Sequence, residues 1–266
     1  MRRSSVADFA VQLARDAGRL IRSSSRPRRI RLKSSHADIR TGTDVAVERF
    51  IVRRIRSRFP EHRIVAEESF AGLPGDDRPL WLVDPIDGTT NYFRGLPFFG
   101  CNIALWADGA VRLGVVVDAA RRIVYWAEAG GGSWAKGRRL RVSEVRELPQ
   151  AVLATGFPYD RGENPDNNLA ELSAVLPRAR AVRTMGCAGL DLVGVAAGRL
   201  DGYWEAGTGP WDSAAGSLLV REAGGEVTTY QGDPWTPAAR TVLATNGRIH
   251  QALLDLIGAA RLKAAP

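Results

Sequence analysis

The chain has 266 residues, of which 45% are hydrophobic and 25% charged, a balance typical of a globular protein with a substantial core. No apolar run approaches the roughly 18 residues that a membrane-spanning helix needs, so we expect no membrane association. The formal net charge of +8 raises nucleic acid as a partner, but most basic residues are arginines, a bias that coding composition alone can produce.

The first predicted element is a helix over residues 4–25, where apolar residues recur at helical spacing. Arg and Ser are frequent in this stretch, as in transit peptides, but Asp8 and Asp16 are atypical of one. With no signal peptide expected, the default compartment is the cytoplasm. A second helix is predicted over residues 43–59. Its charge run over residues 53–58 is interpreted as a solvated face.

Runs rich in β-forming residues, joined by short turns, follow the second helix. We expect strands over residues 63–69, 78–84, 99–106, 110–118 and 121–129. A glycine-rich stretch over residues 130–137 follows a strand with no helix start after it. A hairpin connection is therefore favoured over a phosphate-binding loop.

The character of the chain changes near residue 145, because apolar strands and helical stretches alternate from there. The predicted strands cover residues 151–155, 179–183, 199–205 and 241–245, and the predicted helices cover residues 165–176, 186–198, 212–223 and 247–258. Such alternation is typical of α/β layering. We therefore predict an α+β half over residues 1–145 and an α/β half over residues 146–266, which pack as one body.

The cysteines and histidines offer little catalytic chemistry. Cys101 and Cys187 lie far apart and are flanked by small or apolar residues, which favours buried thiols over a disulfide or a zinc site. The three histidines share no ligand-like spacing. Zinc chemistry and a catalytic histidine are both poorly supported.

Four short acidic stretches carry the candidate chemistry. They contain Asp44 at a helix start, Glu67 and Glu68 at a strand end, Asp84 and Asp87 in "WLVDPIDGTTN", and Asp212 at another helix start. Each has a local explanation as a cap, a turn residue or a surface charge. However, apolar segments precede the aspartates of "WLVD" and "GPWD", and strand ends and helix starts are where α/β proteins gather ligands.

Carboxylates that converge in one cleft repel one another unless a cation neutralises them. Hard oxygen ligands of this kind select Mg²⁺, Mn²⁺ or Ca²⁺. Gly88, Thr89 and Thr90 follow the second aspartate as a candidate helix N-terminus, which suits a phosphate group. Metal ions beside a phosphate seat indicate phosphoryl chemistry.

The ordered motifs "LKSSHADIRTGTD", "AEES", "WLVDPIDGTTN" and "PWDSAAG" resemble the inositol monophosphatase family, over about residues 5–258. The resemblance implies a layered αβαβα sandwich of the inositol monophosphatase and fructose-1,6-bisphosphatase type, usually a homodimer. It also implies a lithium-sensitive phosphatase with two to three Mg²⁺ ions per active site, for which Mn²⁺ can substitute. The implied partner is a small phosphate ester.

The resemblance implies a role for each acidic residue. A first metal would be held by Glu67, Asp84 and the backbone carbonyl of Ile86, and a second by Asp84, Asp87 and Asp212. A third, weaker ion would lie beside Glu67, on waters positioned by Asp44.

Further roles are implied for the residues around the metals. Thr89 would orient the attacking water together with Glu67, while the backbone N–H groups of Gly88 and Thr89 would grip the phosphate. The substrate side would comprise Gly186, Cys187, Ala188, Glu205 as acceptor of a sugar hydroxyl, and the metal-site residues Asp87 and Asp212. Cys187 stands where a small or hydroxyl residue is frequent in the family.

We therefore predict a phosphomonoesterase that hydrolyses inositol 1-phosphate by in-line attack of a metal-activated water. Alternative substrates within the family are fructose 1,6-bisphosphate, histidinol phosphate and phosphoadenosine nucleotides. A different class, a non-catalytic RNA- or ribosome-associated role, rests only on the net charge of +8. Nucleic acid is the less favoured partner, because the sequence has no basic motif interleaved with aromatic residues.

Overall fold

The computed structural model describes residues 3–24, 27 and 29–264. Helix α1 (Ser5–Ser23) begins where the hydroxyl of Ser4 accepts a hydrogen bond from the backbone N–H of Ala7 at 3.1 Å. The predicted apolar stripe is confirmed, because its residues are buried or partly buried in a core shared with the first sheet. The predicted helix end at residue 25 lies outside the described residues.

Helix α2 (Gly42–Arg58) begins at a cap that an acidic side chain completes. Thr41 is the cap residue, and its backbone N–H donates to Asp44 Oδ2 at 2.9 Å. A short antiparallel ladder of β1 (Arg31–Leu32) with β2 (Ile39–Arg40) precedes this helix. The sequence analysis did not predict the ladder, because strands of two residues have no detectable periodicity.

The first sheet has seven strands in sequential order: β3 (Arg63–Ala66), β4 (Leu80–Asp87), β5 (Gly100–Ala107), β6 (Ala110–Asp118), β7 (Ile123–Glu128), β8 (Gly132–Ala135) and β9 (Arg138–Arg139). β3 and β4 are parallel and the other neighbouring pairs are antiparallel. The glycine-rich stretch forms the predicted hairpin connection between β7 and β8.

Two boundaries in this sheet differ from the prediction. The strand expected to reach residue 69 ends at Ala66, because the acidic residues that follow form a 3₁₀ turn, η1 (Glu67–Ser69). β4 continues past the predicted strand end at Asp84, through Pro85, and ends at Asp87, with an irregular register between the two aspartates. The irregularity lets β4 include the proline.

The second sheet has five strands in the order β11 (Ala181–Arg183), β10 (Val152–Thr155), β12 (Gly202–Ala206), β14 (Thr241–Thr245) and β13 (Glu226–Thr228). β10 runs parallel to β11 and β12, and β14 runs antiparallel to β12 and β13. β13 was not predicted, because its three residues follow a helix directly. A short 3₁₀ turn, η2 (Leu148–Gln150), lies between the two sheets in the chain.

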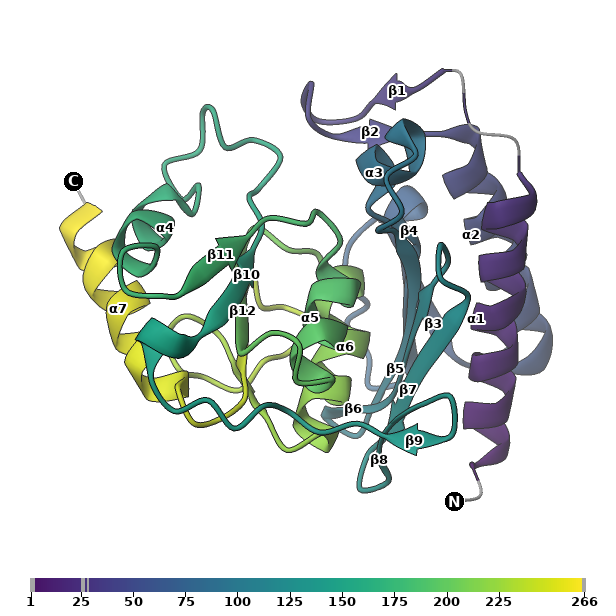
Figure 1. Ribbon diagram of the computed structural model, residues 1–266. Helices are drawn as coiled ribbons and strands as arrows, with labels where there is room; N and C mark the ends of the chain where they lie inside the picture. The colour runs from purple at the N-terminus through teal and green to yellow at the C-terminus, as the bar shows by residue number, and fades with distance from the viewer. Residues whose placement is uncertain (1–2, 25–26, 28, 265–266) are drawn as a thin grey trace.

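Helices and sheets form five layers (Figure 1). α1 and α2 cover one face of the seven-stranded sheet, α5 (Ala188–Ala196) and α6 (Pro210–Glu222) lie between the sheets, and α4 (Leu169–Val175) and α7 (His250–Ala264) cover the five-stranded sheet. α5 is buried along its whole length, as expected for a middle layer. The predicted αβαβα sandwich is confirmed.

The two cysteines behave as small apolar residues, as predicted: both are free and buried. In the described part of the chain, we find no helix with the length and apolar character needed to cross a bilayer.

Candidate functional site

A cleft of about 890 Å³ opens where strand ends and helix starts converge. β4 and β10 deliver their carboxyl ends to it, and α3 (Thr89–Arg94), α5 and α6 deliver their first residues. The predicted site residues that line it are Glu67, Asp84, Ile86, Asp87, Gly88, Thr89, Gly186, Cys187, Ala188, Glu205 and Asp212. Asp44 does not line the cleft, and it is fully buried behind Thr89.

Asp87 is fixed by hydrogen bonds at the start of α5. Its Oδ1 accepts from the backbone N–H of Ala188 at 3.1 Å, and its Oδ2 accepts from the N–H of Gly189 at 2.6 Å. The buried amide of Asn102 also donates to Oδ2, at 3.0 Å. Burial raises the pKa of Asp87, and these hydrogen bonds oppose that effect.

Asp84 has the opposite environment. Its side chain is 2% exposed, and its Oδ1 has no hydrogen-bond partner among the described residues. Burial, and then the negative charges of Glu67, Asp87 and Asp212, raise the pKa of Asp84 well above its usual value. A buried carboxylate without partners is destabilising unless a proton or a cation neutralises it.

Asp212 enters the cleft from the first turn of α6. It is the third residue of the helix rather than its cap, and its Oδ2 accepts from the backbone N–H of Gly209 at 2.6 Å. Burial raises the pKa of Asp212 well above its usual value, and the charges of Glu67 and Asp87 add to this effect. The carboxylate of Asp212 therefore both caps the start of α6 and lines the cleft.

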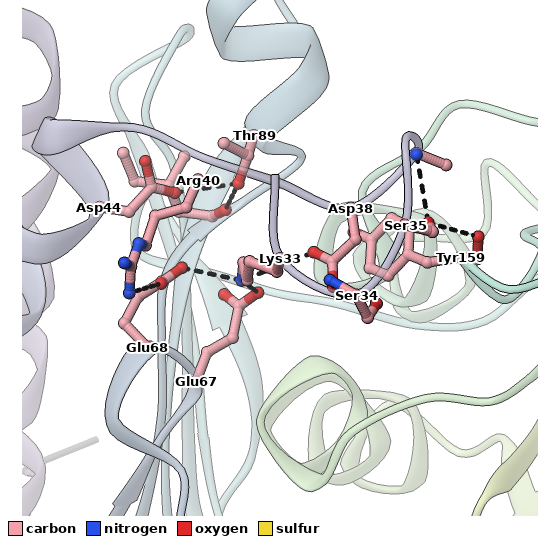
Figure 2. Close-up of polar contacts among 12 residues, drawn as sticks. Lys33, Ser34, Ser35, Asp38, Arg40, Asp44, Glu67, Glu68, Thr89 and Tyr159 are labelled. Atoms are coloured by element: carbon pink, nitrogen blue, oxygen red, sulfur yellow. Dashed lines mark hydrogen bonds and ion pairs between the residues drawn. The ribbon is translucent and has the colours of Figure 1, made fainter. Parts of the chain in front are cut away.

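Glu67 forms an ion pair with a residue that the sequence analysis did not assign. Lys33 Nζ lies 2.7 Å from Glu67 Oε1 and 2.9 Å from Glu68 Oε1, and Arg40 holds the other oxygen of Glu68 at 3.3 Å (Figure 2). Burial raises the pKa of Glu67 to about 7, although Lys33 opposes the shift. The signal for Lys33 was the "LKSSHAD" segment, in which the lysine had been given no role.

Thr89 connects the cleft to the buried Asp44. Its Oγ1 lies 3.0 Å from Asp44 Oδ1 and 2.9 Å from the carbonyl oxygen of Ile86 (Figure 2). The hydroxyl has one proton, so it donates to one of these acceptors at a time. Gly88 precedes Thr89 in the left-handed conformation, with φ of 83°, and starts the six-residue helix α3.

Glu205 lies in β12, one residue before its end. The phenol of Tyr203 donates a hydrogen bond to Glu205 Oε2, and a Cβ atom at Gly156 would overlap the carboxylate. Burial raises the pKa of Glu205 to about 7, although the hydrogen bond from Tyr203 opposes the shift. Glu205 is thus held in one position beside the cleft.

The predicted substrate-side loop also supports Asp87. Ala188 supplies one of its N–H donors, and the thiol of Cys187 donates to the backbone carbonyl of Asp87 at 3.4 Å. The carbonyl oxygen of Gly186 packs close to Gly88, where a Cβ atom would lie 3.0 Å away. The loop therefore connects α5 to the end of β4.

Two segments that are distant in sequence meet beside the cleft. Ser35 Oγ donates to the carbonyl oxygen of Tyr159 at 2.8 Å (Figure 2). Tyr159 lines the cleft, and its side chain is half exposed. The sequence analysis did not find Tyr159, because a tyrosine in a predicted loop has no distinguishing pattern.

The cleft residues suit a hard divalent cation. Four carboxylates from three elements (η1, β4 and α6) meet in the cleft. Burial, and then the charges of neighbouring carboxylates, raise the pKa values of Asp84 and Asp212, and one buried oxygen of Asp84 is unpaired in the described structure. Among the residues that the structure describes, no three His, Cys, Asp or Glu side chains form a ready-made metal cluster. The donors are all carboxylate oxygens, which fit Mg²⁺ or Mn²⁺ in their chemistry.

Comparison with known proteins supports the same conclusion. The model of the inositol monophosphatase family matches residues 2–262. The chain is 40% identical over 231 residues to an inositol-1-monophosphatase of Synechocystis sp., covering 86% of this chain and 80% of the relative. It is 38% identical over 250 residues to Nus factor SuhB of Escherichia coli strain K12, covering 93% of each chain.

Solved structures agree with the fold. The inositol monophosphatase from Anabaena (Nostoc) sp. PCC 7120 superposes with a TM-score of 0.85 at 39% identity, covering 96% of each chain. The Thermotoga maritima IMPase TM1415 superposes with a TM-score of 0.86 at 34% identity, covering 97% of this chain and 98% of the other. The layered fold and its acidic cleft define a phosphatase of a metal-dependent class. The chain belongs to the inositol monophosphatase family.

Proposed function

We propose that this protein is a Mg²⁺-dependent phosphomonoesterase that hydrolyses inositol 1-phosphate. The observation that carries the proposal is the convergence of Glu67, Asp84, Asp87 and Asp212 on one cleft, where a buried oxygen of Asp84 has no partner in the described structure. The similarity to an inositol-1-monophosphatase of Synechocystis sp. supports the substrate.

Two metal positions follow from the carboxylates. Glu67, Asp84 and the carbonyl of Ile86 would hold one ion, and Asp84, Asp87 and Asp212 would hold the second. A third, weaker ion would lie near Glu67. Bound there, Mg²⁺ or Mn²⁺ would supply charge neutralisation and Lewis-acid activation. Lys33 occupies one oxygen of Glu67 at 2.7 Å, so this ion pair has to rearrange when a metal binds.

The chain's own groups orient the reactants. The hydroxyl of Thr89 accepts a hydrogen bond from the attacking water and passes its own proton toward Asp44, which lies 3.0 Å away. Asp44 is held in place by the backbone N–H of Thr41 at 2.9 Å. Glu67 completes the orientation of the water, and the N–H groups of Gly88 and Thr89 bind the phosphate oxygens. Attack is in line, without a phospho-enzyme.

The alcohol portion of the substrate faces Glu205 and the loop of Gly186, Cys187 and Ala188. Glu205 accepts a hydrogen bond from a substrate hydroxyl. A broader range of sugar phosphates, including fructose 1,6-bisphosphate, histidinol phosphate and phosphoadenosine nucleotides, is the alternative within the family. We also propose a cytoplasmic homodimer and inhibition by lithium, as the family resemblance implies.

Phosphate release from a panel of inositol, sugar, nucleotide and aryl phosphates, with Mg²⁺ and with EDTA, tests this function. We expect Mg²⁺-dependent hydrolysis with the highest kcat/KM for inositol 1-phosphate. A chiral-phosphate ester should be hydrolysed with inversion at phosphorus. Activity that persists in EDTA, or retention of configuration, would contradict the proposed mechanism.

A second role is suggested by the relatives named Nus factor SuhB, one of which covers 93% of this chain. The side chains of Arg53, Arg54, Arg56 and Arg58 are exposed on α2. We propose that this arginine face of α2 binds nucleic acid electrostatically. A gel shift with RNA should weaken steeply as salt rises, and the quadruple change of these arginines to serine should abolish it. A shift that is insensitive to both salt and the substitutions would contradict this role.

A further inference from the structure

Asp191 is a buried acidic residue of the cleft that the proposed chemistry does not use. Its side chain is 1% exposed, and it lines the cleft. Its Oδ1 has no hydrogen-bond partner among residues 3–24, 27 and 29–264. Buried polar groups in folded proteins are almost always hydrogen-bonded, so an unpaired carboxyl oxygen in a ligand cleft indicates a missing partner.

The position of Asp191 in α5 directs it toward the alcohol side of the cleft. It follows Ala188 by three residues, and residues at this spacing lie on the same face of a helix. Ala188 donates its N–H to Asp87, so this face of α5 borders the acidic site. Asp191 therefore lies one helical turn beyond the residues that fix Asp87.

Glu205 is the other acidic group on this side. β12 delivers it to the same cleft, and α5 lies directly against the sheet that contains β12 (Figure 1). Burial, and next the negative charge of Glu205, raise the pKa of Asp191. The carboxyl groups of Asp191 and Glu205 therefore border the same region of the cleft. Tyr203 donates a hydrogen bond to only one oxygen of Glu205.

The basic side chains that line the cleft are Lys33, Arg161 and Arg240, and in the described part of the chain none of them forms an ion pair with Asp191 or Glu205. Lys33 is engaged with Glu67 and Glu68 at 2.7 and 2.9 Å. A ligand with hydroxyl groups would satisfy both carboxyls, because each hydroxyl can donate to a carboxyl oxygen and accept from a protonated one.

We propose that Asp191 binds a second substrate hydroxyl, next to the one bound by Glu205, and so contributes to the preference for an alcohol that carries hydroxyls over one that does not. This inference rests on the proposed phosphatase function and deepens it by assigning a further residue to recognition of the alcohol. Asp191 is a specificity residue that contacts the substrate away from the phosphate.

A matched pair of esters tests the inference. Inositol 1-phosphate and cyclohexyl phosphate share a six-membered carbon ring, but only the first carries hydroxyls. For each protein we compare kcat/KM for the two esters with Mg²⁺. Both esters are assayed with the same preparation of each protein. A partly unfolded fraction therefore lowers both kcat/KM values equally and leaves their ratio unchanged. Losing a hydrogen bond to a charged group lowers kcat/KM by about 10- to 100-fold.

We expect Asp191→Leu to lower the ratio by about tenfold or more, and Asp191→Asn to lower it less, because the amide still bonds a hydroxyl. Ser217→Ala is the matched control: Ser217 is also buried, and its hydroxyl also has no partner in the described structure, but it does not line the cleft. The control should keep the wild-type ratio.

Three results would overturn the inference, and they are distinguishable. An unchanged ratio in Asp191→Leu, with a lowered ratio in Glu205→Ala, leaves the phosphatase and removes Asp191 from the substrate site. An equal fall in kcat/KM for both esters makes Asp191 a structural residue. If the wild type hydrolyses neither ester in Mg²⁺, the proposed function fails and the inference fails with it.

Discussion

Hydrogen bonding separates the cleft carboxylates into two kinds. Asp87 accepts from two backbone N–H groups and an amide, so its ionised form is supported by the fold itself. Asp84 is equally inaccessible, but one of its oxygens has no partner in the described structure. Its ionised form depends on a ligand. The same substitution should therefore have different effects on stability at the two positions.

Asp84→Asn and Asp87→Asn should both nearly abolish Mg²⁺-dependent turnover, because each removes a proposed metal ligand. In EDTA, Asp84→Asn should be at least as stable as the wild type, since it removes a repelling charge. Asp87→Asn should be less stable by about 1–3 kcal/mol, because an amide group would face the N–H donors of α5. Urea unfolding in EDTA measures both. If Asp84→Asn and Asp87→Asn are equally stable in EDTA, the proposed difference between the two carboxylates is wrong.

Thr89→Ala should lower kcat by roughly 10²- to 10⁴-fold with little change in KM, because its hydroxyl orients the water and does not bind the alcohol. Ser57→Ala is the control for loss of a hydroxyl: Ser57 is exposed on α2 and does not line the cleft, so both parameters should keep their wild-type values. Steady-state kinetics with inositol 1-phosphate separates the two parameters. A change confined to KM would assign Thr89 to substrate binding.

Glu205 should make the metal-free protein less stable as pH rises. Its pKa is raised from 4.5 to about 7 in the folded state. The folded state therefore binds more protons than the unfolded state between these values, and the stabilisation is lost as pH rises through that window. Glu205→Gln should flatten this part of the profile, measured by urea unfolding in EDTA at a series of pH values. An unchanged slope would show that Glu205 is not the titrating group.

At the scale of elements, the short β1/β2 ladder determines where a positive charge lies beside the cleft, although each of its strands has only two residues. Lys33 follows β1 directly, and the backbone N–H of Lys33 donates to the carbonyl of Asp38 at 2.9 Å, which extends the ladder toward the cleft. The ladder thereby places an ammonium group between Glu67 and Glu68. A strand of only two residues therefore positions the ammonium group of Lys33, which pairs with Glu67 and Glu68 of η1.

Lys33→Met should lower the free energy of unfolding in EDTA by about 1–3 kcal/mol, because two half-buried carboxylates lose a charged hydrogen-bond donor. Added Mg²⁺ should reduce the difference, since the proposed ion would neutralise Glu67 instead. Thermal unfolding with and without Mg²⁺ checks this. Lys136→Met, in the turn between β8 and β9, is the control and should have no Mg²⁺-dependent effect.

The sequence predicted those elements whose own residues determine them. β6 (Ala110–Asp118) and β14 (Thr241–Thr245) match their predicted bounds, because long apolar runs define them. The short strands β1, β2 and β13 have only two or three residues each, too few to show a periodicity. Asn102 and Asp191 were missed because their surroundings come from distant parts of the chain: each is an unremarkable polar residue until the fold brings it beside Asp87 or Glu205. The acidic cleft residues were found because they lie within motifs.

At the scale of the whole molecule, the middle helical layer connects stability to the site. α6 packs against the seven-stranded sheet and carries Asp212 in its first turn, while α5 carries the N–H groups that fix Asp87. Two of the three proposed ligands of the second metal, Asp87 and Asp212, therefore depend on how closely this layer approaches the first sheet. Small residues on the sheet set that distance.

Gly114 in β6 is the position that tests this dependence. A Cβ atom there would lie 2.5 Å from the backbone carbonyl oxygen of Ala215 in α6, so Gly114→Ala has to push the helix away from the sheet. We expect a loss of about 1–3 kcal/mol in the free energy of unfolding, as for other overpacked sites. Because Asp212 moves with the helix, a higher Mg²⁺ concentration should be needed for half-maximal activity.

Gly258→Ala is the matched control, because Gly258 lies in α7 and a Cβ atom there would have no described neighbour within 4 Å. It should raise stability by up to about 1 kcal/mol, since alanine favours a helix interior over glycine. Its Mg²⁺ requirement should equal that of the wild type. Thermal unfolding and Mg²⁺ titrations of both variants give the comparison. If Gly114→Ala loses stability but keeps the wild-type Mg²⁺ requirement, the position of α6 does not control the second metal site, and Asp212 adjusts independently of its helix.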